Sequence, residues 1–114
     1  MTKASDPYFA LIFDSLDLIE FYRPETKEEF FASPMAQDAI NMRLQAIGEY
    51  LFRVRKLDEE QFDVLAPRSW HQVIGLRHRI SHGYHLIDQD AVWQIISIEL
   101  PPFRESLESI RSKL

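Results

Sequence analysis

A stripe of aliphatic residues at helical spacing runs through the middle of this chain and limits how it can fold. The stripe consists of Ile40, Leu44, Ile47, Leu51 and Val54. Intervals of three and four residues place these side chains on one face of an α-helix. Ser33 followed by Pro34 is typical of a helix N-cap and first turn, so we predict one helix from Pro34 to about Lys56, about 33 Å long. Because the stripe covers only one face, this helix must pack against other helices.

Shorter helical segments are predicted before the stripe. Asp6 with Pro7 repeats the pattern of an N-cap followed by proline, and apolar residues then recur at helical spacing to about Tyr22. Thr26 opens a short turn that ends at Phe31. The region before the long helix therefore holds one full helix and one short turn.

The region after the stripe contains further helix signals. Residues 57–67 form a connection with one turn, which Asp58 begins. Ser69 and Gln72 have the spacing of a capping box and predict the start of another helix. That helix should weaken around Gly83.

The remaining residues predict two more helical pieces. Asp88 or Asp90 caps the next helix, Pro101-Pro102 interrupts it, and a final helix begins near Phe103. No alternating strand pattern of useful length and no hairpin signal are present. We therefore predict an all-α fold, an antiparallel bundle of four to five helices, in a single domain over residues 1–114.

Composition excludes several classes of protein. The chain has no cysteine, which excludes disulfides, thiol nucleophiles and cysteine-based zinc sites. Its three glycines are too scattered for a dinucleotide-binding loop. The longest apolar run, from Tyr8 to Phe13, is too short to span a membrane, and no signal-peptide pattern precedes it. We therefore expect a soluble, cytoplasmic protein.

Charge is unevenly distributed along the chain. The net charge of −5 argues against a protein that coats nucleic acid non-specifically. Residues 64–87, however, contain no Asp or Glu, and they hold three arginines and all four histidines. Residues 14–29 have the opposite balance. This pattern suggests a local anion site, although ordinary charge fluctuation explains it equally well.

The segment 77–84 reads Arg-His-Arg-Ile-Ser-His-Gly-Tyr and concentrates groups that can do chemistry. Arg77 is permanently charged and suits a phosphate, and the imidazole of His82 can exchange a proton at neutral pH. The two are about 140° apart around an ideal helix, so they converge only if the helix ends or unwinds near the histidine. Gly83 is suited to such an ending. Tyr84 would then present its hydroxyl outside the core.

An arginine and a histidine together suit the cleavage of RNA by the neighbouring 2′-hydroxyl, which needs a base, an acid and charge stabilisation but no metal. One chain offers one such histidine, so a two-fold dimer would supply the second. Two other interpretations stay open. Arg and His complement the dipole at a helix C-terminus. His71, His78, His82 and His85 also form a helical stripe with the spacing of a zinc site, although no carboxylate lies nearby in the sequence.

Several short segments, taken in order, resemble the HEPN superfamily of small helical ribonuclease-type domains. The resemblance is closest to the HepT-like toxins that are paired with a minimal nucleotidyltransferase antitoxin of the MntA type. It covers most of the chain. The segments are Phe30, residues 44–49, Pro67 with Trp70, residues 74–77, residues 82–84, Ile87-Asp88 with Val92-Trp93, and Leu100-Pro101.

The resemblance implies a HEPN-like four-helix core and a homodimer with a composite cleft, where two R-x-x-x-x-H motifs meet. It implies that Arg77 and His82 are the catalytic pair of a metal-independent endoribonuclease that leaves 2′,3′-cyclic phosphate ends on its RNA substrate. His78 stands where the family usually has asparagine, and His78 and Arg79 are candidate accessory residues. An imidazole is bulkier than an amide and titrates, so His78 bears on rate and pH dependence.

The resemblance also implies a regulatory partner. Tyr84 matches the tyrosine that the partner nucleotidyltransferase adenylylates from ATP, and the chain itself needs no cofactor. The added bulk and negative charge beside Arg77 would block RNA. The implied function is the toxin of a type VII-like toxin–antitoxin system. The alternative is a non-catalytic subunit that binds substrate for the nucleotidyltransferase, or presents itself to it.

Three residues outside the motif have two interpretations each. Glu49 could face the cleft, but we expect a solvated side chain. Trp70 and Trp93 could stack on RNA bases, but we expect them to pack in the core.

Overall fold

The computed structural model describes residues 3–82 and 87–114, and for residues 79–82 it describes the backbone alone. The described residues are almost entirely helical and include no strand, so the all-α prediction is confirmed. The elements are α1 (Asp6–Tyr22), α2 (Lys27–Phe31), α3 (Pro34–Leu57), α4 (Glu59–Leu65), α5 (Arg68–His82), α6 (Gln89–Gln94), a π-helical turn (Ile95–Glu99), α7 (Leu100–Ile110) and a 3-10 turn (Arg111–Lys113).

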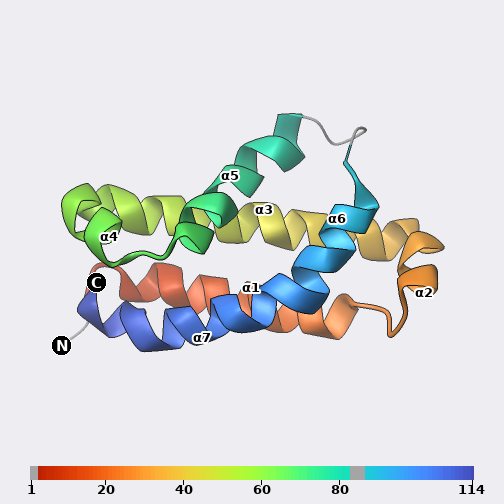
Figure 1. The fold of residues 1–114 in the computed structure, drawn as a ribbon, viewed down its shortest axis with the longest axis horizontal. Helices are drawn as coiled ribbons and strands as arrows, with labels where there is room; N and C mark the ends of the chain where they lie inside the picture. Colours follow the sequence, from red (N-terminus) through yellow and green to blue (C-terminus); the bar gives the residue numbers. More distant parts are fainter. Residues whose placement is uncertain (1–2, 83–86) are drawn as a thin grey trace.

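Helix α3 is the central element of the bundle. Helix α1 runs antiparallel along one side of it, α7 lies beside α1, and α5 crosses α3 obliquely on the other side (Figure 1). All five residues of the aliphatic stripe are buried, as the spacing predicted. Burial of each such side chain contributes roughly 1.5–3 kcal/mol. The two ends of the chain meet, because the Lys3 ammonium donates to the carbonyl oxygen of Ser112.

Side-chain caps begin four of the helices. The Thr26 hydroxyl accepts from the Glu29 N–H and the Ser33 hydroxyl accepts from the Ala36 N–H. The carboxylates of Asp58 and Asp88 accept from backbone N–H groups of α4 and α6 in the same way. The predicted starts at these positions are confirmed, because each cap satisfies an N–H that the first helical turn leaves without a backbone acceptor.

Two predicted helix starts were wrong, by one residue for α1 and by two residues for α5. Helix α1 begins at Asp6, and its N-cap is Ser5, whose side chain makes no capping hydrogen bond. The Asp6 carboxylate instead accepts from the backbone N–H of Lys3 at 2.8 Å. Helix α5 begins before Ser69, because the carbonyl oxygen of Pro67 accepts from the Trp70 N–H at 3.0 Å and closes the first turn earlier.

The predicted interruption at Pro101-Pro102 was also wrong. Helix α6, the π-helical turn and α7 follow one another without a loop, and both prolines lie in the first turn of α7. The wider π turn accommodates them: the Leu100 N–H donates to the carbonyl oxygen of Ile95, five residues back. A helix can therefore continue through a proline pair where its hydrogen-bond register shifts just before it.

Helix α1 supplies the donor that this register shift requires. Pro101 has no N–H to offer to the carbonyl oxygen of Ile96. The Arg23 guanidinium, which follows α1, donates to that oxygen at 3.2 Å and to the Ser97 hydroxyl at 3.0 Å. It also lies 4.8 Å from the centre of the Trp93 ring. These contacts tie the end of α1 to the π-helical turn.

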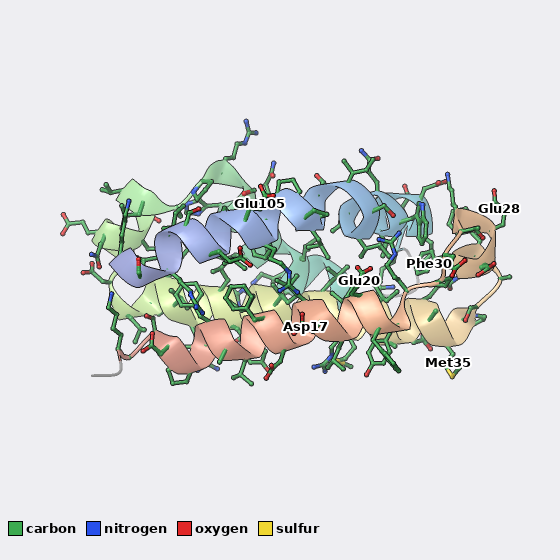
Figure 2. The ribbon with its side chains drawn as sticks, turned by 90° about the horizontal axis from the view of Figure 1, so that it is seen from below. Asp17, Glu20, Glu28, Phe30, Met35 and Glu105 are labelled. Carbon is green, nitrogen blue, oxygen red and sulfur yellow. The ribbon has the colours of Figure 1, made fainter. Side chains whose placement is uncertain are left out.

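Three carboxylates gather on the face of the bundle that α1 and α7 form. Asp17 and Glu20 of α1 and Glu105 of α7 line a shallow groove on the face that Figure 2 presents, with Arg104 paired to Asp17 at 2.6 Å. Helix α5, which carries the arginine- and histidine-rich segment, lies on the far side in that view. None of the helices in the described ranges combines the length and the apolar content that crossing a bilayer requires.

Candidate active site

Helix α5 approaches α3 closely because residue 48 has no side chain. A Cβ atom at Gly48 would lie 2.7 Å from the carbonyl oxygen of Val73 and 3.1 Å from the backbone nitrogen of Arg77. Both are backbone atoms of α5, so neither can rotate away. Glycine therefore permits this crossing, and the crossing brings Arg77 against α3.

Arg77 is held at the crossing by two side chains of α3. One of its terminal guanidinium nitrogens lies 3.4 Å from Oε2 of Glu49. The guanidinium carbon lies 3.7 Å from the centre of the Phe52 ring, which is cation–π contact. The Arg77 side chain is 22% exposed. A cation that is partly buried yet reaches solvent suits the binding of a phosphate oxygen.

Besides Arg77 of α5, Glu49 and Phe52 each contact one cation of their own helix, α3. The other carboxylate oxygen of Glu49 lies 3.1 Å from Nε of Arg53. The Lys56 ammonium lies 5.3 Å from the centre of the Phe52 ring. The site therefore gathers three cations of α3 and α5 around one carboxylate and one ring.

The Glu49 carboxylate is partly solvated, at 39% exposed, and it is also paired with arginines of two helices. The sequence did hold a signal for this packing. Gly48 interrupts a long amphipathic pattern, and a glycine inside a helix often marks a close approach. That signal indicates where another helix passes, and hence that Glu49, the next residue, lies near it.

The structure describes only some of the other predicted site residues. His78 is exposed on α5. The side chains of Arg79 and His82 and the whole of Tyr84 lie outside the described residues. The backbone of α5 is helical through His82, which places residues 77 and 82 about 140° apart around the axis. The assignment of Arg77 and His82 as a catalytic pair, of His78 and Arg79 as accessory residues and of Tyr84 as the modified residue stays a prediction.

His71 has a carboxylate nearby that the sequence did not reveal. Its Nε2 lies 3.6 Å from Oδ1 of Asp63 in α4. Asp63 in turn accepts from two nitrogens of Arg55, at 3.0 Å and 3.1 Å, and these hydrogen bonds hold the pKa of the Asp63 carboxyl below its usual value. The described residues hold no group of three His, Asp or Glu side chains close enough to bind a metal ion. The expectation that no carboxylate lies near the histidines was wrong for His71.

Trp70 lies within the hydrophobic core, and Trp93 packs against the edge of it. Trp70 is fully buried between Phe9 and Phe62, and its indole N–H donates to the Ser106 hydroxyl at 2.8 Å. Trp93 is half-buried against Phe30 and Arg23. The expectation of packing rather than base stacking is confirmed for Trp70, whose ring has no exposed surface.

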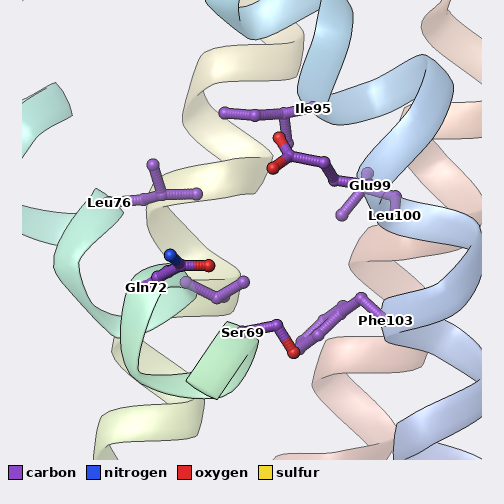
Figure 3. A pocket seen from close by; sticks show the side chains of 8 residues that line it. Ser69, Gln72, Leu76, Ile95, Glu99, Leu100 and Phe103 are labelled. Atoms are coloured by element: carbon purple, nitrogen blue, oxygen red, sulfur yellow. The ribbon is translucent and has the colours of Figure 1, made fainter. Parts of the chain in front are cut away.

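A cavity of about 240 Å³ lies on the other side of α5, between this helix and α7 (Figure 3). Ser69, Gln72, Val73, Leu76, Ile95, Glu99, Leu100 and Phe103 line it. Arg77 and its contacts Glu49 and Phe52 are not among the lining residues. The cavity is therefore a space distinct from the arginine site.

The fold and the site define a class: a small helical bundle that presents an arginine at the crossing of two helices. The sequence model of the family described as "Ribonuclease HepT-like" matches residues 12–110. The chain belongs to this HepT-like ribonuclease family. The predicted resemblance to the HEPN and HepT-like proteins is confirmed.

Three relatives illustrate the family. A Methanocaldococcus jannaschii protein named as a gamma-glutamylcyclotransferase and presumed RNase is 26% identical over 100% of this chain, which spans only 50% of that protein. A presumed RNase of the same organism is 28% identical over 89% of this chain and 94% of its own length. A presumed RNase of Caldanaerobacter subterraneus subsp. tengcongensis is 26% identical over 97% of each chain. No solved structure matches the chain significantly.

Proposed function

We propose that this chain is a metal-independent endoribonuclease that acts as the toxin of a toxin–antitoxin pair. The observation that carries the proposal is Arg77, which α3 holds beside Glu49 and Phe52 at a partly exposed position of a HepT-like fold. Arg77 begins an R-x-x-x-x-H motif whose last residue, His82, is still within α5. The names of the relatives point to the same class of reaction.

The proposed reaction is cleavage of RNA by its own 2′-hydroxyl. The 2′-oxygen attacks the adjacent phosphorus and the 5′-oxygen leaves, so the products are a 2′,3′-cyclic phosphate and a 5′-hydroxyl. One imidazole takes the proton of the 2′-hydroxyl, and another gives a proton to the leaving oxygen. Arg77 stabilises the charge that builds on the phosphate oxygens. Each proton and electron pair is accounted for without a metal.

The proposed active unit is a homodimer. The reaction needs two proton-transfer groups, and one chain has one histidine in the motif. Within one helix, residues 77 and 82 point about 140° apart. Two copies with their α5 helices facing each other would bring two arginines and two histidines into one cleft.

The proposed regulation is adenylylation of Tyr84 by a partner nucleotidyltransferase that consumes ATP. Tyr84 lies two residues beyond His82 in the sequence. An attached AMP carries a phosphodiester charge that would compete with RNA for the arginines of the motif. A phenol with a pKa of about 10 is a poor proton-transfer group at neutral pH, so the tyrosine itself is dispensable for cleavage.

Cleavage of RNA by the purified protein, with chelator present, tests the enzymatic proposal. We expect cleavage with 2′,3′-cyclic phosphate ends and its loss in both Arg77→Ala and His82→Ala. Full activity of His82→Ala, or loss of wild-type activity on chelation, contradicts the mechanism. Tight RNA binding without any cleavage would instead favour the alternative, a non-catalytic subunit that presents substrate to the nucleotidyltransferase.

Incubation with the partner nucleotidyltransferase and ATP tests the regulatory proposal. The intact mass of the wild type should rise by whole AMP units and its cleavage of RNA should fall. Tyr84→Phe should keep cleaving RNA and gain no mass. Equal labelling and silencing of Tyr84→Phe would show that another residue is the target.

A further inference from the structure

We propose that Glu49 and Phe52 are positioning residues, which orient the Arg77 guanidinium toward the phosphate of the substrate. This inference rests on the proposed ribonuclease function and adds two residues outside the R-x-x-x-x-H motif. Both lie on α3, within four residues after Gly48.

Phe52 holds the guanidinium of Arg77 against α3. The guanidinium carbon lies 3.7 Å from the centre of the ring, which is close cation–π contact. At this distance the cation is held against the ring by both dispersion and the ring quadrupole. An arginine side chain has several rotatable bonds, so this contact removes much of its freedom before substrate arrives.

Glu49 fixes the direction of one terminal nitrogen of the guanidinium. Its Oε2 lies 3.4 Å from one terminal nitrogen of Arg77. The carboxylate is itself held, because its other oxygen accepts from Nε of Arg53 at 3.1 Å. An anchored carboxylate on one edge directs the rest of the planar fork, which is the geometry that a phosphate needs from arginine.

Nearby cations offset the negative charge of Glu49. Arg53 contacts the same carboxylate, and Lys56 lies over the ring of Phe52. Lys56 is also paired with Glu59 at 2.8 Å. With Glu59 included, the cluster of Glu49, Arg53, Lys56, Glu59 and Arg77 carries three positive charges and two negative charges. Glu49 can therefore orient Arg77 without repelling the phosphate from the site.

The matched variants are Glu49→Gln, which keeps the shape and removes the charge, and Phe52→Leu, which keeps apolar volume and removes the ring. Glu105→Gln on α7 is the control, because it makes the same change of net charge on the far face of the bundle. We expect kcat for RNA cleavage to fall between about tenfold and a hundredfold in both test variants, with KM within about threefold of wild type. Glu49→Asp should recover part of kcat, and the control should match the wild type.

A second measurement reports on Arg77 without any reaction. The side-chain N–H signal of Arg77, assigned by its loss in Arg77→Lys, should show a ring-current shift and slow exchange with solvent in the wild type. Phe52→Leu should remove the shift, and Glu49→Gln should broaden the signal. Lower kcat together with these changes supports the inference.

Three outcomes would overturn the inference. One is unchanged kcat in Glu49→Gln and Phe52→Leu. Another is a lower KM with unchanged kcat in Glu49→Gln, since Glu49 would then only compete with phosphate. The third is an unaltered Arg77 signal in both variants. If the wild type cleaves no RNA, the proposed function fails by itself, and the Arg77 signal alone then decides whether these side chains orient the arginine.

Discussion

Helix α3 meets its two long neighbours, α1 and α5, by different means. Toward α1 it presents aliphatic side chains, and the seam is filled by buried residues of both helices. Toward α5 it presents Gly48 and, beside it, the charged and aromatic side chains that hold Arg77. The two interfaces are similar in extent, but only the second contains a close backbone approach at a glycine and the side chains that hold Arg77.

The two faces of α3 therefore contribute differently: the face toward α1 mainly stabilises the fold, and the face toward α5 positions Arg77. Dispersion and burial in the α1–α3 seam are shared among many side chains, so no single residue determines where α1 lies. At the α3–α5 crossing, one missing Cβ atom determines the separation of two backbones. Ile47 and Gly48 are adjacent in the chain and about 100° apart around the helix. A substitution of Ile47 therefore tests the aliphatic packing, and a substitution of Gly48 tests the crossing with α5.

The largest effect on stability is expected for Ile47→Ala. Ile47 is fully buried, so truncation removes its packing and leaves a cavity in the seam. We expect a loss of about 2–5 kcal/mol in the free energy of unfolding, measured by denaturant titration. Because the α3–α5 crossing keeps its glycine, kcat per folded molecule should stay close to that of the wild type. A large fall in kcat would show that the two interfaces are not independent.

Gly48→Ala should have the opposite profile. Alanine favours a helix by about 1 kcal/mol over glycine, but its Cβ would lie 2.7 Å from a backbone oxygen of α5. The helices must therefore move apart, at a net loss of about 1–3 kcal/mol. The same movement displaces Arg77, so kcat should fall about tenfold or more.

The comparison of these two variants is the informative measurement. Ile47→Ala should lose more stability and less activity, and Gly48→Ala should lose less stability and more activity. Denaturant titration and single-turnover cleavage of a short RNA, both on the same protein preparations, give the two rankings. If Gly48→Ala is more stable than the wild type and equally active, α5 does not depend on this close approach.

The sequence predicted most of the α1–α3 side, because its contacts repeat. Aliphatic residues at intervals of three and four gave the position of α3, and the caps at Thr26, Ser33 and Asp58 gave helix starts. The prolines were misread, since a proline pair normally ends a helix. The π-helical turn that admits them depends on Arg23, which is more than seventy residues away in the chain. No local pattern contains that contact.

The sequence predicted less of the α3–α5 side, because the individual contacts that hold Arg77 follow no repeating pattern along the chain. The motif identified Arg77 as a candidate, and the resemblance gave it a role. The partners of Arg77 lie on another helix, at positions where a glutamate and a phenylalanine look like ordinary surface and core residues. Only the crossing of the two helices shows that Glu49 and Phe52 belong to the same site.

The smallest effect is expected at the other end of the same crossing, for Asp63→Asn. Asp63 joins Arg55 of α3 to His71 of α5, and the hydrogen bonds from Arg55 lower its pKa. A lowered pKa in the folded state stabilises the protein above the unfolded value of about 3.9, and this contribution is lost as the pH falls through the folded value. The pair is exposed to solvent, so the effect is small.

Thermal unfolding should give Asp63→Asn a midpoint temperature slightly below that of the wild type at about pH 6.5 and equal to it at about pH 2. Asparagine keeps one acceptor oxygen for Arg55, so the difference reports the charge. A difference of the same size at both pH values would mean that packing at the α4–α5 junction, and not the ion pair, holds this end of α5.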